Sequence, residues 1–156
     1  MSDSSVARSQ PPSLIVREIE REDADAVAEL SGQLGYEASA ETIKERIAQL
    51  PSHKERQVVF VACLGSEIVG WIEASIMHDL QSPPYSLIGG LVVREERRSL
   101  GIGKTLCAEV EAWSSKQGIT VIRVTSRLSR EGAHKFYLRE GFQRIKTWAV
   151  FEKMLP

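Results

Sequence analysis

A short run of basic and glycine residues has the composition of an anion-binding loop. Arg98 and Lys104 flank Gly101 and Gly103, and the run joins an apolar strand pattern to a helix pattern. The first turn of a helix carries unpaired backbone N–H groups and a partial positive charge, which together stabilise an anion. Glycine lacks a Cβ atom, so a phosphate can approach the backbone closely. The run therefore indicates a phosphate cradle, although the same spacing also occurs in simple tight turns.

Two common nucleotide-binding loops fit this run poorly. The dinucleotide fingerprint Gly-x-Gly-x-x-Gly needs a third glycine where Leu106 stands. The P-loop needs a glycine at the position of Arg98, although its end matches Gly103, Lys104 and Thr105. A P-loop phosphate binder is also disfavoured because no acidic pair ends the strand pattern at 119–125. The pattern that does fit is Arg-x-x-Gly-x-Gly, from position 98 to position 103.

This pattern resembles motif A of the GNAT superfamily, the acyl-CoA-dependent N-acetyltransferases, in which the loop binds the pyrophosphate of coenzyme A. A second stretch resembles the family's motif B, because Ala133, Phe136 and Tyr137 are followed by Gly141 and Phe142. The resemblance covers residues 14–155. It implies an enzyme that moves an acetyl group from acetyl-CoA to a primary amine, by direct transfer in a ternary complex. The alternative is a non-catalytic acyl-CoA-binding or sensor domain on the same fold.

The resemblance also implies which residues contact the co-substrate acetyl-CoA. The pantetheine arm pairs with the backbone of Leu91, Val92 and Val93, and the Leu91 N–H stabilises the charge on the thioester oxygen. Arg130 stands where many relatives have asparagine, and it either reaches a cofactor phosphate or lies in solvent. No metal is expected. The pyrophosphate is expected to meet the loop residues Arg98, Ser99, Leu100, Gly101, Ile102, Gly103 and Lys104.

Two residues are candidates for proton transfer. Tyr137, in the motif B match, is the expected acid for the departing thiolate, and its alternative role is aromatic packing beside Phe136. Glu73 is the expected base for the acceptor ammonium because it interrupts an apolar strand face, where partial burial raises a carboxyl pKa. The alternative for Glu73 is an ordinary edge-facing carboxylate. The weaker candidates for the base are His134, His78 and Asp79.

Hydrophobic periodicity predicts the element order β-α-α-β-β-β-α-β-α-β, an α/β fold of the GNAT type. Its mixed sheet has an antiparallel front half and one parallel crossover, with strands four and five splayed around the cofactor as the resemblance implies. Gly89 and Gly90 suggest a bulge or a close ligand approach within strand four. The predicted strands are 14–19, 57–64, 67–77, 86–93, 119–125 and one or two strands within 142–155. The predicted helices span about 22–35, 39–50, 101–117 and 129–141.

Composition narrows the function class further. The chain has 156 residues and a net charge of −1, and this length predicts a single domain, placed at 14–156. Residues 1–13 are polar and lack an apolar core, which predicts a disordered tail. No basic block indicates nucleic-acid binding, and no apolar run reaches the roughly 20 residues of a membrane span. We expect Cys63 and Cys107 to be buried thiols of a cytoplasmic protein. The acceptor is expected to be a small cationic amine, an aminoglycoside or a peptide amine, and a homodimer is possible.

Overall fold

The computed structural model describes residues 12–50 and 55–156. Most of the predicted tail at 1–13 therefore lies outside the described residues, as does His53. The described residues form two compact units, one that ends at Thr125 and one that begins at Ser126. Within the described ranges, no helix has both the length and the apolar character needed to cross a membrane.

The first unit is built on a five-stranded sheet in which each strand lies beside its neighbour in the sequence. The first four strands pair antiparallel, and the fifth is parallel to the fourth. The predicted mixed sheet with one parallel crossover is therefore confirmed. The fifth strand is shorter than predicted, because only three residues of 119–125 pair with β4. The strands are β1 (Leu14–Glu18), β2 (Gln57–Leu64), β3 (Glu67–Met77), β4 (Tyr85–Val93) and β5 (Ile122–Val124).

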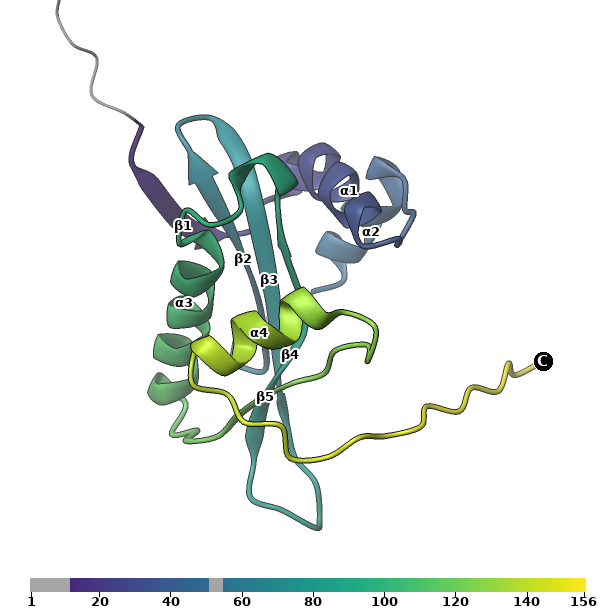
Figure 1. The fold of residues 1–156 in the computed structure, drawn as a ribbon. Coiled ribbons are helices and arrows are strands. Elements are labelled where there is room, and N and C mark those ends of the chain that lie inside the picture. The colour runs from purple at the N-terminus through teal and green to yellow at the C-terminus, as the bar shows by residue number, and fades with distance from the viewer. Residues whose placement is uncertain (1–11, 51–54) are drawn as a thin grey trace, which may run out of the picture. The chain divides into compact units, whose positions relative to one another are not determined.

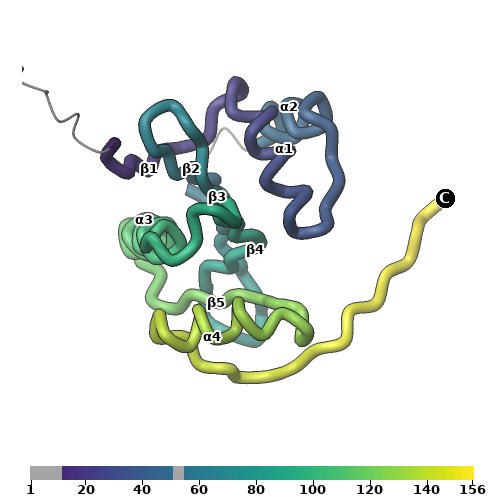
Figure 2. Tube along the Cα trace, turned by 45° about the horizontal axis from the view of Figure 1, so that its top comes forward, coloured from purple at the N-terminus to yellow at the C-terminus, as the bar shows by residue number. Residues whose placement is uncertain are grey.

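Helices cover both faces of this sheet. Two helices, α1 (Ala24–Gln33) and α2 (Ala40–Ala48), lie on one face, and α3 (Ile102–Lys116) lies on the other (Figure 1, Figure 2). The first pair packs apolar side chains such as Leu30 and Ile43 against the strands. The predicted start of α2 is confirmed, because the Ser39 hydroxyl accepts a hydrogen bond from the backbone N–H of Thr42, the third residue of the helix.

The contact between α3 and the sheet depends on Gly70 in β3. A Cβ atom at Gly70 would lie 3.2 Å from Leu106 Cδ1 and 3.3 Å from Ile102 Cγ2. The absent side chain thus lets the first turns of α3 approach the strand closely. Ile102, Leu106 and Val110 are at most 2% exposed, so the helix predicted at 101–117 buries an apolar stripe with helical spacing.

The second unit contains α4 (Glu131–Arg139) and an extended C-terminal segment, residues 142–156 (Figure 1). The helix ends near Gly141, whose φ of 91° is in the left-handed region that favours glycine. The prediction of one or two closing strands within 142–155 is not met in this single chain, because no residue of the segment belongs to a strand. A strand is defined by backbone pairing with a neighbour, and within the described residues of the second unit the segment has no such pairing.

Candidate active site

The pairing between β3 and β4 changes register at Gly89. Ser75 lies opposite Leu87, whereas Glu73 lies opposite Gly90, so β4 contains one extra residue. This confirms the bulge predicted from the two consecutive glycines. Backbone N–H groups point alternately to the two edges of a strand. One extra residue therefore reverses the edge toward which each later N–H group points.

Backbone hydrogen bonds on either side of the bulge show its effect. Before the bulge, the Ser86 N–H donates at 3.0 Å to the carbonyl of Val121, the residue before β5. After the bulge, the Arg94 N–H donates at 2.7 Å to Val69 O in β3. Because N–H groups alternate between the two edges of a strand, those of Leu91 and Val93 point away from β3.

The edge that these groups face is open in the described sheet. β5 pairs with β4 only at Ser86–Ile88, so no described strand lies beside Leu91 and Val93 on that side. The side chain between them, Val92, is 2% exposed and belongs to the core. The backbone of Leu91 and Val93 thus presents donors at the edge, while the side chains of the segment stabilise the fold.

The loop between η2 (Glu95–Arg97), a turn of 3₁₀ helix, and α3 contains two residues in the left-handed region. Their φ angles are 68° at Ser99 and 78° at Gly101. Glycine accommodates such a φ, whereas a left-handed conformation costs a residue with a side chain roughly 1–2 kcal/mol. The strain at Ser99 had no signal in the sequence. It turns the chain so that the exposed residues 98–101 lead directly into the first turn of α3.

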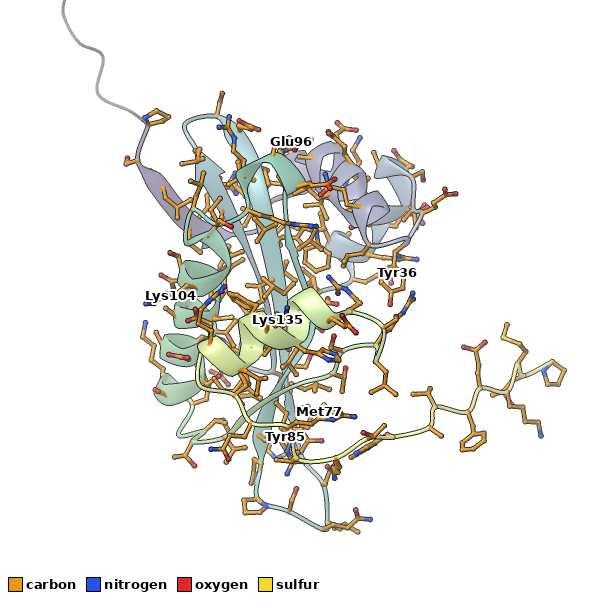
Figure 3. All side chains as sticks on the ribbon, viewed as in Figure 1. Tyr36, Met77, Tyr85, Glu96, Lys104 and Lys135 are labelled. Atoms are coloured by element: carbon orange, nitrogen blue, oxygen red, sulfur yellow. The ribbon has the colours of Figure 1, made fainter. Side chains whose placement is uncertain are left out.

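The N-terminus of α3 has no side chain that compensates its positive end. Gly101 is the N-cap, no side chain caps the helix, and its first turn holds no acidic residue. The first backbone bond of the helix runs from the Thr105 N–H to the Gly101 carbonyl at 3.0 Å, so the N–H groups of 102–104 have no acceptor within the helix. Lys104 adds an exposed positive charge on this turn (Figure 3). These features fit an anion such as a pyrophosphate.

The carboxylate of Glu73 lies beside the bulge. Its Oε1 atom would be 3.3 Å from a Cβ at Gly89 and 3.4 Å from a Cβ at Gly90. Burial raises the pKa of Glu73 above its ordinary value, and the positive charge of Arg46 in α2 opposes this only in part. Glu73 thus lies opposite Gly90, the residue that precedes Leu91 in β4, within one unit.

Asp79, one of the weaker candidates for the base, makes a structural contact. Asp79 accepts a hydrogen bond of 3.0 Å from the Tyr85 hydroxyl. Tyr85 also pairs with Met77 at the end of β3 and β4, as their neighbouring positions in Figure 3 show. Arg123 lies over the Tyr85 ring with its guanidinium carbon 4.1 Å from the ring centre. These contacts give Asp79 a structural role at the β3–β4 turn.

In the second unit, Tyr137 lies in α4 between two aromatic neighbours. Its ring makes edge contacts with Phe136 and Phe142, at centroid distances of 5.4 and 5.6 Å. The aromatic packing considered as an alternative role is therefore present, and it fixes the ring on the helix. His134 Nε2 lies 3.0 Å from the Arg127 carbonyl. Because a carbonyl can only accept, this nitrogen carries the hydrogen and donates it, and the lone pair of the neutral ring is then on Nδ1.

Arg130 occupies the N-cap position of α4 and is exposed. Its backbone N–H donates to the Arg127 carbonyl at 3.0 Å, and its side chain does not cap the helix. The structure thus sets the backbone of Arg130 and leaves its side chain at the surface of the second unit.

Comparison with known proteins identifies the family. Residues 17–142 match the sequence profile of the Acetyltransferase (GNAT) family. An aminoglycoside N(6')-acetyltransferase type 1 of Stenotrophomonas maltophilia is 27% identical over 136 residues, which cover 85% of this chain and 89% of the relative. An aminoalkylphosphonate N-acetyltransferase of Salmonella typhimurium strain LT2 is also 27% identical, over 83% of this chain and 84% of the relative.

A similar fold is found among solved structures. The aminoglycoside N-acetyltransferase AAC(6')-Iy in complex with CoA has a TM-score of 0.80 at 20% identity, covering 94% of this chain and 98% of that one. This likeness confirms the expected fold class, and the profile match covers most of the chain, including the matches to both motifs. The chain therefore belongs to the GNAT family and is an acetyl-CoA-dependent N-acetyltransferase.

Proposed function

We propose that the acceptor is a small cationic amine, with aminoglycosides as the first class to test. The two relatives described above act, by their names, on an aminoglycoside and on aminoalkylphosphonates, which are small amines. A partly buried carboxylate, Glu73, attracts an ammonium group. Tyr36, which is 57% exposed between α1 and α2 (Figure 3), adds an aromatic surface on the same side of the sheet. Peptide amines are the second class to test.

Acetyl-CoA supplies an activated acetyl thioester when it is bound. The residues that would hold it are the open edge of β4 at Leu91–Val93 and the loop and helix start at 98–104. The uncapped first turn of α3 and the outward N–H groups of Leu91 and Val93 support this assignment. The arrangement requires β4 and β5 to splay beyond Ile88, where their pairing ends. In this proposal, the surface side chain of Arg130 interacts with a phosphate of the co-substrate.

Each step of the transfer then has a residue to perform it. Glu73 accepts a proton from the acceptor ammonium, because an amine attacks only through a free lone pair. The Leu91 N–H donates to the thioester oxygen as negative charge develops on it. Tyr137 donates a proton to the departing thiolate. The acetyl group passes directly to the amine, since Cys63 and Cys107 are buried and cannot form a covalent intermediate.

The observation that carries this proposal is the position of Glu73 beside the bulge that turns the Leu91 N–H outward. The family profile spans both structural units, which supports the expectation that 14–156 acts as a single acetyltransferase domain. The test follows release of free CoA thiol with acetyl-CoA and three acceptor classes: aminoglycosides with a 6'-amino group, aminoalkylphosphonates, and peptides with a free amine. Turnover restricted to peptides would overturn the small-amine assignment.

A further inference from the structure

Three arginines lie close together in the sequence just before α3, and their surroundings differ. Arg94 precedes η2 and Arg97 ends it, and both make ion pairs with other elements of the first unit. Arg98 begins the co-substrate loop, the name used here for residues 98–104. It is exposed and makes no ion pair within the described part of the chain. Of the three charges, that of Arg98 is therefore available to a ligand, and the other two have a different role.

The guanidinium of Arg94 joins α1 to the start of β3. Its Nη1 donates to Glu29 Oε1 in α1 at 2.8 Å, and its Nη2 donates to the Ile68 carbonyl in β3 at 3.2 Å. Its Nε lies 3.3 Å from Glu67 Oε1. The Arg94 side chain is only 16% exposed. A single surface ion pair contributes little, but a planar guanidinium with several partners at once has a fixed position.

The main chain around Arg94 is held at the same point. Its N–H donates to the Val69 carbonyl at 2.7 Å, and its own carbonyl accepts from the Arg97 N–H at 2.9 Å. The next carbonyl, that of Glu95, accepts from the Arg98 N–H at 3.3 Å. The first residue of the co-substrate loop is therefore connected to Arg94 by one turn of hydrogen-bonded chain, and movement of Arg94 displaces this residue too.

Two further side chains hold η2, which lies beside α1 and the turn between β2 and β3 (Figure 1). Gln33 lies one helical turn after Glu29 in α1, and its Oε1 accepts from the Glu95 N–H at 3.2 Å. The second carboxylate oxygen of Glu67 accepts from Arg97 Nη2 at 3.1 Å. Side chains of α1 and β3 thus fix η2 from both sides.

We propose that Arg94 is a positioning residue for acetyl-CoA: its contacts with α1 and β3 fix η2, and η2 sets the start of the co-substrate loop. This inference rests on the proposed site at 98–104 and adds residues outside it. Ser99 and Gly101 have positive φ angles, and a strained backbone such as that at Ser99 persists only where its surroundings hold it. A loop that is already ordered loses less conformational freedom on binding, so its affinity for the ligand is higher.

A direct contact between Arg94 and a phosphate is the alternative, and the geometry disfavours it. Each of the three guanidinium nitrogens faces a protein oxygen, and two carboxylates oppose its charge. Lysine separates the two roles, because it keeps the positive charge but cannot place donors on separate partners as the planar guanidinium does. In Arg94→Lys a charge that contacts phosphate is preserved, whereas the positioning of η2 is lost.

The first experiment combines calorimetric titration with acetyl-CoA and steady-state kinetics. Arg94→Lys is expected to weaken acetyl-CoA binding about 10-fold and to leave kcat at saturating acetyl-CoA within about 2-fold, because only co-substrate binding is affected. Arg17→Lys is the matched control. Arg17 also donates two hydrogen bonds to a carboxylate, that of Asp23, at 2.8 and 2.9 Å, but it lies in β1 at the edge of the sheet. This control is expected to lose stability without any change in acetyl-CoA affinity.

The partners of Arg94 provide variants that disturb the fold less, because Glu29 and Glu67 are themselves 65% and 41% exposed. Glu29→Gln and Glu67→Gln each remove a charge that Arg94 contacts, and each is expected to weaken acetyl-CoA binding roughly 3-fold. When Arg94→Lys and Glu29→Gln are combined, the loss is expected to be smaller than the product of the two single losses, because both remove the same contact. Wild-type affinity in both glutamine variants would contradict the proposal.

Hydrogen exchange without acetyl-CoA measures the order of this segment directly. The amides of Arg97 and Arg98 are hydrogen-bonded within the turn, and they are expected to lose protection in Arg94→Lys while amides of β2 keep theirs. Unchanged acetyl-CoA affinity in Arg94→Lys would overturn the proposal, and so would an equal loss in Arg17→Lys, because the effect would then be one of stability alone. If Gly103→Ala weakens binding and Arg94→Lys does not, only the role of Arg94 fails. If neither variant weakens binding, the co-substrate site at 98–104 fails as well.

Discussion

The indole ring of Trp71 occupies the space that a side chain at Gly90 would need. A Cβ atom at Gly90 would lie 2.7 Å from Trp71 Cη2 and 2.8 Å from Cζ3. These two residues lie on neighbouring strands, and Gly90 is directly opposite Glu73. The absence of a side chain at Gly90 therefore lets the aromatic ring and the carboxylate both lie against β4 at the bulge.

Replacing Gly90 with alanine is expected to lower the free energy of unfolding by about 1–3 kcal/mol, as overpacking of a rigid ring does. The variant is also expected to lower activity, because movement of Trp71 disturbs the neighbouring carboxylate of Glu73. Chemical denaturation and thiol release measure the two effects. Gly89→Ala is the control for the unfolding free energy alone, since its Cβ would meet Glu73 Oε1 at 3.3 Å and no atom of the Trp71 ring. Equal effects of the two variants would contradict the role of the Trp71 ring.

The pyrophosphate cradle is best tested at Gly103, the second residue of α3. Gly101 is less suitable, because its φ of 78° would strain any residue with a side chain. Alanine is favoured over glycine within a helix, so Gly103→Ala is expected to keep or raise stability. It is expected to weaken acetyl-CoA binding at least 10-fold, because the added Cβ holds the anion away from the backbone. Calorimetric titration with acetyl-CoA measures the affinity.

Gly32→Ala is the matched control for this experiment. Gly32 lies within α1, and a Cβ atom there would have no atom within 4 Å apart from its own helix and chain neighbours. The control is expected to gain similar stability without any change in affinity. An unchanged affinity in the Gly103→Ala protein would remove the first turn of α3 from the co-substrate site.

Replacing Glu73 with glutamine is expected to lower kcat/KM for the acceptor and to leave acetyl-CoA affinity unchanged. The loss should shrink at high pH, where the free amine is already abundant. Glu111→Gln, an equal charge change at an exposed position of α3, should have no effect. If the pH–rate profiles of the Glu73→Gln protein and the wild type overlay, Glu73 is not the base.

The pH dependence of stability in the same variant tests whether the pKa of Glu73 is raised. Because burial raises this pKa in the folded state above the ordinary 4.5, the folded protein holds the proton more tightly than the unfolded chain. The wild type therefore loses stability as pH rises from the unfolded pKa through the folded pKa. Glutamine does not titrate, so the variant is expected to lack this loss. Urea denaturation at acidic and neutral pH measures the difference.

Replacing Tyr137 with phenylalanine is expected to lower turnover roughly 100-fold, with little change in acetyl-CoA affinity. The substitution keeps the edge contacts with Phe136 and Phe142, so the ring should keep its place on α4. Steady-state kinetics with a saturating acceptor measures the effect. Full activity in this variant would show that water or another group protonates the thiolate.

The sequence predicted the features of the fold that depend on burial within one chain. The apolar stripe of α3 and the antiparallel order of β2, β3 and β4 follow from periodicity, because the buried faces of both elements lie against partners in the same unit. The bulge also had a signal, since Gly89 and Gly90 interrupt an otherwise apolar strand. A closing strand within 142–155 was predicted by the same apolar rule, but an apolar pattern does not show whether a neighbouring strand is present to pair with it.

Other features of the site depend on the direction of backbone N–H groups and on strained φ angles. The residue types in the sequence do not show either of these. Family resemblance suggested the role of the Leu91 N–H, but its direction depends on the position of the extra residue in β4. Ser99 has a φ of 68° although serine has no preference for that region. The short pairing of β5 likewise depends on three-dimensional contacts, because the apolar run at 119–125 is long enough for a longer strand.

The strands follow the same order in the sheet as in the chain. This order has a consequence for folding. β2, β3 and β4 form a meander, so each strand closes a short loop onto its predecessor at low entropic cost. β5 can dock only after the chain has crossed α3, and three residue pairs hold it. We therefore expect β5 to join last and to open first. The edge proposed to receive acetyl-CoA can then widen by local opening, without loss of the meander that carries Glu73.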